Sequence, residues 1–193
     1  MIEGRLSTTP DLRQHLRKAT QANHEALDRQ FGSLNLNARA DYTRFLLAHG
    51  LGLQTFQPDL DRFAEEELAA AAPNLLSLVQ DDLAELGQSL PQSAPQPGSA
   101  HSTAAVAYVL CGSRLGLAHL RHLGYWGAEH GIARRYMEDR EALALWKPLV
   151  AWLGARPAQG PEADRITVSA RECFATFSRS FEASGRLMSA SAR

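Results

Sequence analysis

His24 is the residue of this chain whose neighbours best suit metal chemistry. Asp28 follows it by four positions, so on a helix the two side chains share one face. The carboxylate can then hold one ring nitrogen of the imidazole and leave the other as a metal ligand. Arg17 and Thr20 precede His24 on the same stripe. A histidine bordering an apolar helix face is more often structural than a ligand, so His24 alone favours the structural interpretation.

A second unusual pattern is a pair of glycines on one helix face. Gly112 and Gly116 lie four positions apart within Tyr108–Ala118. Each glycine in a helix interior costs about 1 kcal/mol relative to alanine, so the pair needs a compensating role. Close helix–helix packing is one such role. Close backbone approach to a flat ligand, with a point where the helix bends, is the other, and the pattern alone does not separate them.

Other candidate groups are weaker. His119 and His122, with His130 nearby, have spacing compatible with zinc, but no cysteine or well-placed carboxylate completes a site, so surface histidines are the preferred interpretation. Cys111 and Cys173 form neither a disulfide framework nor a C-x-x-C motif and are expected to be reduced and buried.

Helices must position these residues, because apolar residues recur at helical spacing and no segment alternates like a strand. Thr9-Pro10-Asp11 predicts the first helix start. Pro58 is expected to kink or restart the second helix, a short Ala-rich segment should follow over 65–72, and 91–98 is predicted to be a loop. The stretch after Gly124 is expected to be irregular. The predicted helices cover about 10–30, 40–62, 75–86, 101–123, 139–154 and 162–185.

The sequence therefore predicts a single-domain, all-α helical bundle of seven or eight helices. The chain has 193 residues, a net charge of −1 and 45% hydrophobic residues, which suits one soluble domain and excludes a protein devoted to nucleic-acid binding. No apolar run approaches a membrane span, and a cytoplasmic location is expected. Residues 1–5 resemble a protease-recognition scar, the domain should cover 6–186, and 187–193 are expected to be a disordered tail.

Taken together, the two motifs resemble those of the heme oxygenase family. Leu16–Asp28 is similar to the proximal helix of that family, with its Leu-basic-x-Ala-Thr-x-x-x-His core. Gly112-Ser113-Arg114-Leu115-Gly116 resembles the distal helix of bacterial members, in the Gly-Ser-x-Leu-Gly form. Further similarity in 42–49, 146–153 and the Phe174, Phe177, Phe181 run extends the resemblance over about residues 10–185.

The resemblance implies a heme-degrading enzyme. Heme would be both cofactor and substrate, O2 the co-substrate, and an external donor of the ferredoxin or reductase type would supply electrons. His24 would be the axial iron ligand, oxygen would bind beneath Gly112 and Gly116, and the products would be biliverdin, CO and free iron. The other positions carried over as heme-binding are Arg17, which aligns with a propionate-pairing base, and Thr20, Asp28, Tyr108, Ser113, Leu117 and Phe177.

Three positions depart from the family pattern. Ser113 stands where some relatives carry an aspartate that organises distal water, so the proton-delivery group is not identified by sequence. Leu117 replaces a small residue and is expected to narrow the distal pocket or alter regiochemistry. Asp28 replaces a commoner glutamate, and its shorter arm is expected to reach His24 through a water.

Several functions remain open at this point. A heme carrier or sensor on the same scaffold would also use His24 but would not cleave heme. A thiamin-degrading or quinone-cofactor-forming relative would need no iron and could use Cys111 or Cys173. A plain helical interaction module requires both motifs to be coincidental. Biliverdin could serve iron acquisition or a photoreceptor, and no residue decides between these uses.

Overall fold

The computed structural model describes residues 11–92 and 101–191, and every extended regular element in these ranges is a helix. The all-α prediction is therefore confirmed. Residues 1–5, Thr9, Pro10 and most of the expected 91–98 loop lie outside the described residues. The helices of the described ranges are α1 (Leu12–Ala19), α2 (Gln21–Phe31), α3 (Arg39–Leu68), α4 (Leu75–Glu85), α5 (Thr103–Leu123), α6 (Trp126–His130), α7 (Arg135–Glu138), α8 (Glu141–Gly154) and α9 (Pro161–Ser191).

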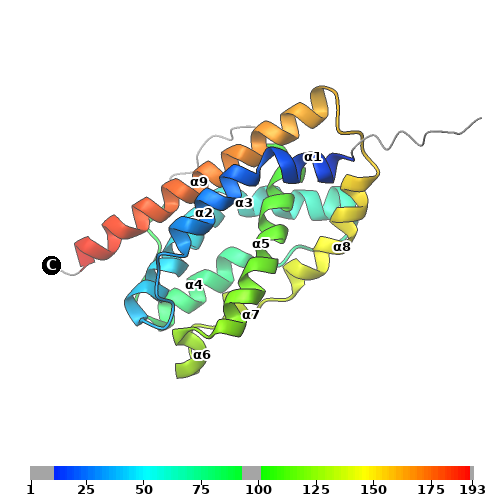
Figure 1. The fold of residues 1–193 in the computed structure, drawn as a ribbon. Helices are drawn as coiled ribbons and strands as arrows, with labels where there is room; N and C mark the ends of the chain where they lie inside the picture. The colour runs from blue at the N-terminus through cyan, green and yellow to red at the C-terminus, as the bar shows by residue number, and fades with distance from the viewer. Residues whose placement is uncertain (1–10, 93–100, 192–193) are drawn as a thin grey trace, which may run out of the picture.

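Two long helices, α3 and α9, form the frame of the bundle and pack extensively on each other. Helix α4 covers α3, and α5 packs on α3, α8 and α9 (Figure 1). Helix α2, drawn in blue in Figure 1, lies along α9. The core contains aromatic and leucine side chains from nearly every helix, among them Tyr42, Phe45, Phe56, Leu60 and Phe63.

Helix α3 continues through Pro58, where a kink or restart was predicted. Pro58 is exposed, whereas Phe56 and Leu60 on either side of it are fully buried. Packing of these flanking residues offsets the lost backbone hydrogen bond. The same helix runs on to Leu68, so the first half of the predicted separate Ala-rich segment over 65–72 is its last turn, and the second half follows the helix.

The predicted first helix over 10–30 is two helices that meet at Thr20. The Thr20 hydroxyl donates to the carbonyl of Leu16 at 2.8 Å, and such a side-chain bond bends a helix. The observed N-cap of α1 is Asp11, whose Oδ1 accepts the amide of Gln14 at 2.8 Å. The segment was predicted correctly as a helix start, but with Thr9 as the cap and Asp11 in the first turn, whereas Asp11 is the cap.

Short α7 is held in place by a buried carboxylate of α4. Asp82 is fully buried and accepts the backbone amides of Arg135 at 3.0 Å and Tyr136 at 2.9 Å. Arg135 Nη1 also lies 3.5 Å from Asp82 and 2.6 Å from Glu85. Burial raises the pKa of Asp82, and these donors oppose the rise. A four-residue helix cannot be stable alone, so this tertiary capping is what creates α7.

We expect Asp82→Asn to lower the free energy of unfolding by about 2–3 kcal/mol, because the amide cannot accept both backbone N–H groups and leaves a buried donor unpaired. Urea unfolding of the purified protein measures this change. Asp81→Asn, one position away on an exposed site, is the matched control and should be nearly neutral. Equal stability of the two variants would contradict the capping role.

The C-terminal helices are longer or more numerous than predicted. Helix α9 runs from Pro161 to Ser191, so residues 187–191 are helical although a disordered tail was expected there. Within the irregular stretch, α6 forms a single short helix between Tyr125 and Gly131. Helix α8 matches the predicted 139–154 segment closely.

Helix α5 is long and apolar enough, by length and composition, to cross a membrane, and is the one such helix among residues 11–92 and 101–191. The sequence was expected to contain no apolar run that approaches this length. Half of its apolar window is buried, and the helix packs on α3, α8 and α9 in the bundle. These contacts are those of a core helix.

Candidate functional site

Helix α2 has no buried residue, and its His24 exposes an imidazole to solvent. The side chain of His24 is 58% exposed, and its Nδ1 lies 2.8 Å from Oδ2 of Asp28. On its inner side the ring meets the edge of Phe174 in α9, with centroids 5.8 Å apart. The contact with Asp28 favours a proton on Nδ1, which leaves Nε2 with a free lone pair.

The direct His24–Asp28 contact corrects one expectation from the sequence. A bridging water was predicted because aspartate is shorter than glutamate. At an i, i+4 spacing the shorter arm reaches the ring without an intermediary.

The N-terminal end of this site is a junction between α5 and the α1–α2 bend. Tyr108 of α5 is half-buried and lies close to Thr20, which is itself buried at the bend. Burial raises the pKa of Tyr108, and the Thr20 side chain and the guanidinium groups of Arg17 and Arg13 oppose the rise. The structure thus brings together three of the predicted residues, Arg17, Thr20 and Tyr108, beside a second cation, Arg13, that the sequence reading did not single out.

One turn beyond this junction, the two helices carry the two predicted motifs. His24 follows Thr20 by four residues, and Gly112 follows Tyr108 by four. Helix α2 then runs along α9 while α5 continues towards α7, and α2 and α5 do not pack extensively on each other (Figure 1). The helix with the imidazole and the helix with the glycines therefore diverge from a shared end at Thr20 and Tyr108.

The two glycines of α5 have different surroundings. A Cβ atom added at Gly112 would meet the indole of Trp146 at 3.3 Å, so this glycine permits close packing of α8. A Cβ atom added at Gly116 would meet nothing within 4 Å, and Gly116 is exposed. Packing explains Gly112 but gives no reason for a glycine at Gly116, where alanine would stabilise the helix.

The side chains of Ser113 and Leu117 both have contacts of their own. The Ser113 hydroxyl donates to the carbonyl of Leu110 at 2.8 Å, within its own helix. Leu117 is only 5% exposed and lines a hollow shared with α7 and α8. The expectation that Leu117 narrows a pocket beside Gly116 therefore gains no support from its position, and its influence on any product stays a prediction.

An aromatic cluster formed by α2, α3, α7 and α9 contains a histidine, His49, for which the sequence predicted no role. The ring of His49 in α3 lies among Phe31, Phe45, Tyr136 and Phe177, at centroid distances of 4.7, 4.2, 5.3 and 6.1 Å. Phe177 packs here and on Phe56, whereas the phenylalanine in contact with His24 is Phe174. A heme-binding role for Phe177 stays a prediction.

His49 is a neutral imidazole in this environment. Its Nδ1 lies 2.9 Å from the carbonyl of Phe45, which fixes the proton on Nδ1. Burial and the nearby guanidinium of Arg114 lower its pKa from the ordinary value of 6.5 to about 4. At neutral pH, His49 can accept a hydrogen bond at Nε2 but carries no charge.

The lowered pKa of His49 predicts an acid limb in stability. Between about pH 6.5 and 4 the unfolded chain binds a proton at this residue and the folded protein does not, so stability is full above pH 6.5 and falls as the pH drops towards 4. His49→Phe keeps a ring in the cluster and should flatten this part of the curve, measured by urea unfolding across that range. His119→Phe, at an exposed site, should leave the limb as in the parent protein, and an unchanged limb in His49→Phe would reject the assignment.

Arg114 lies within the glycine motif of α5, and, like His49, it was given no role from the sequence. It is 3% exposed, donates from Nη1 to the carbonyl of Tyr136 at 3.0 Å, and lies over that ring at 4.3 Å. The sequence signal was present: a charged residue at a helix position whose neighbours on the same face, Leu110 and Leu117, are apolar.

The described residues contain neither a zinc site nor a reactive cysteine, the two alternative kinds of site considered from the sequence. His119, His122 and His130 are exposed, and no group of three His, Cys, Asp or Glu side chains within 11–92 and 101–191 could hold a metal ion. Cys111 and Cys173 are buried free thiols, and burial raises the pKa of each to about 12. Neither cysteine is suited to act as a thiolate nucleophile at neutral pH.

Comparison with known proteins agrees with this arrangement at the level of the fold. No protein-family model and no curated protein matches the chain. Among solved structures it is similar to the heme oxygenase from Neisseria meningitidis in its NO- and CO-bound forms, with a TM-score of 0.69 and 23% identity. The match covers 90% of this chain and 92% of that chain. The protein therefore has the heme oxygenase fold, and the resemblance noted in the sequence is confirmed for the fold.

Proposed function

We propose that this protein is a heme oxygenase that binds heme between α2 and α5, with His24 as the axial ligand, and opens the macrocycle to biliverdin, CO and free iron. The observation that carries the proposal is the exposed imidazole of His24, fixed by Asp28, on a helix with no buried residue. Such a helix lacks packing on its open side, and a flat apolar ligand would supply it.

The residues around this space suit heme in three respects. His24 offers a neutral nitrogen, the preferred donor for heme iron in many proteins. Gly116 leaves the face of α5 open, so its backbone can approach a planar ring. Arg17 and Arg13, beside Tyr108, provide guanidinium groups that match the carboxylates of the heme propionates.

Bound heme would supply both the iron that activates oxygen and the carbon skeleton that is cleaved. The chain itself holds a proton on His24 Nδ1 through Asp28, which increases the electron donation of the ligand nitrogen.

Exposed cations of α1 support the proposed electron donor. Arg13, Arg17 and Lys18 are all exposed on this helix, next to the Tyr108 junction. A ferredoxin-type donor with an acidic face would be attracted to them, and electrostatic steering raises its association rate. A cytoplasmic location completes the proposal as a prediction from the sequence. Iron acquisition and supply of biliverdin to a photoreceptor are the two uses of the product that the proposal leaves open.

A heme carrier or sensor is the second candidate, and one observation favours it. The Ser113 hydroxyl is already bonded to the Leu110 carbonyl, so the distal motif shows no free hydroxyl donor for proton delivery. A heme protein without that donor would bind heme and release it intact.

Aerobic titration with hemin, followed by a reductant and a ferredoxin–reductase pair, tests both candidates. Stoichiometric binding and then loss of the Soret band with growth of a biliverdin spectrum, in the presence of catalase, is the expected result. A stable Soret band with every donor would establish the carrier. Failure to bind hemin would reject both.

A further inference from the structure

A second hollow of about 300 Å³ lies behind α5, between that helix and the α7–α8 connection. It is separate from His24, which is not among its lining residues. Its polar wall consists of Arg114, Arg121, Arg140 and Asp139. Its apolar wall includes Leu117, Met137 and Leu143.

The charges of this hollow are not balanced. Three guanidinium groups and one carboxylate give a formal lining charge of +2 (three minus one). Asp139 is occupied elsewhere, because its oxygens accept the amides of Glu141 at 3.2 Å and Ala142 at 3.3 Å at the start of α8. In the part of the chain that the structure describes, none of the three arginines forms an ion pair.

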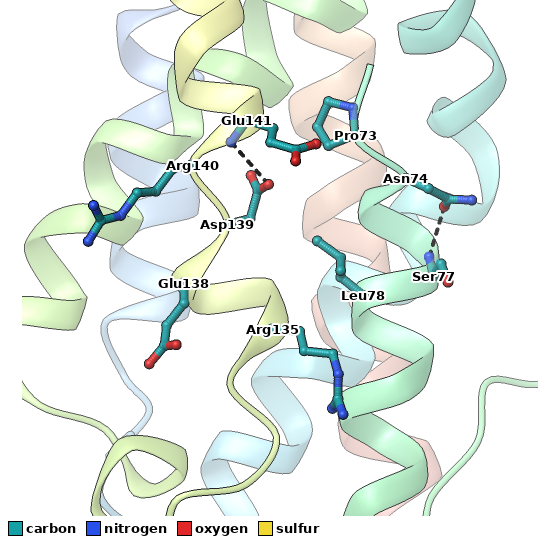
Figure 2. Close-up of a pocket in the computed structure, with 9 residues that line it drawn as sticks. All are labelled: Pro73, Asn74, Ser77, Leu78, Arg135, Glu138, Asp139, Arg140 and Glu141. Carbon is teal, nitrogen blue, oxygen red and sulfur yellow. Dashed lines mark hydrogen bonds between the residues drawn. The ribbon is translucent and has the colours of Figure 1, made fainter. Parts of the chain in front are cut away.

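The unbalanced charge is energetically unfavourable mainly at Arg114, because this residue is buried. It is 97% buried, and its Nε has no hydrogen-bond partner within the described residues. Buried guanidinium groups are normally matched by a carboxylate, since an uncompensated charge loses its hydration. The adjacent hollow provides a contrast: Arg135, which lines it, is paired with Glu85 and Asp82 (Figure 2).

We propose that the hollow behind α5 binds a small organic carboxylate. Its charge would complement Arg114, Arg121 and Arg140, and a short apolar body would lie on the leucines and Met137. Figure 2 shows Arg140 pointing away from Asp139 and Glu141, which frees its guanidinium for the other side of the connection. The volume, about 300 Å³, limits the ligand to a compact molecule. Because Arg114 stands between Gly112 and Gly116, such a ligand would act on the helix of the proposed heme site from its opposite face.

The test uses the protein without heme, so its outcome is independent of the proposed oxygenase activity. Isobutyrate, isobutyramide and inorganic phosphate are titrated separately at constant ionic strength, with binding measured by calorimetry and by the shift in Tm. We expect isobutyrate to bind and raise Tm, and the neutral amide to do neither. Binding of phosphate as tight as that of isobutyrate would overturn the carboxylate assignment, as would the absence of any binding.

Variants locate the site. Arg121→Gln combined with Arg140→Gln should weaken isobutyrate binding at least tenfold, and neither side chain belongs to the core. Lys147→Gln combined with Arg165→Gln removes the same charge from exposed positions on α8 and α9 and should bind as the parent does. Retained binding in the first double variant would overturn the proposal.

Discussion

His24→Ala is expected to remove the axial ligand and to weaken hemin binding by at least 100-fold, with loss of the histidine-ligated absorption spectrum. The side chain is 58% exposed and contributes one ring contact to the core, so the free energy of unfolding should change by less than about 1 kcal/mol. Hemin titration followed by absorbance, alongside urea unfolding, separates the two effects.

Two comparisons sharpen this experiment. Added imidazole should restore a liganded spectrum to His24→Ala, because the free base can occupy the space of the missing ring. Arg17→Ala should reduce hemin affinity far less, since an exposed ion pair contributes about 1 kcal/mol or less. A parent-like spectrum in His24→Ala would reject the ligand assignment while leaving the fold intact.

Gly116→Leu is expected to stabilise the protein and to abolish hemin binding. Leucine is favoured over glycine in a helix by about 1 kcal/mol, and a Cβ atom here meets nothing within 4 Å. The side chain would occupy the open face of α5 where the heme plane is proposed to lie. Thermal unfolding and hemin titration of one sample should therefore move in opposite directions.

Gly154→Leu is the matched control for this substitution. It is also an exposed helical glycine, at the end of α8, and its nearest neighbour would be an Asp11 oxygen at 3.8 Å. It should bind hemin as the parent protein does. Normal hemin binding by Gly116→Leu would show that this face of α5 is not part of the heme site.

The helices that could be predicted from the sequence are those whose apolar spacing and capping residues lie within the helix itself. The 75–86 and 139–154 predictions match α4 and α8 closely, because apolar spacing and capping residues are local. Helix α7 was missed because it depends on Asp82, a distant residue of α4 that accepts two of its backbone amides. The bend at Thr20 was also missed, although the bond from its hydroxyl to the Leu16 carbonyl is local. The predicted break at Pro58 did not occur, because the buried residues on either side of Pro58 stabilise a continuous helix.

The candidate site shows the same division. The pairing of His24 with Asp28 follows from i, i+4 spacing within one helix, and the sequence predicted it, apart from the unneeded water. The roles of His49 and Arg114 come from elements far apart in the chain, where aromatic rings and the Tyr136 carbonyl surround them. Leu117 faces α7 and α8, a contact that no pattern within α5 alone specifies.

The absence of buried residues from α2 has a thermodynamic consequence. An eleven-residue helix is marginal by itself, and here its packing comes mainly from α9. Its local opening should therefore cost much less than global unfolding, so that the ligand-free protein is an ensemble in which α2 transiently melts while the α3–α9 frame persists. Part of the intrinsic affinity for a ligand at His24 is then spent on ordering this helix. A substitution that raises its helical propensity at an exposed position such as Gln21 would tighten binding without touching the ligand.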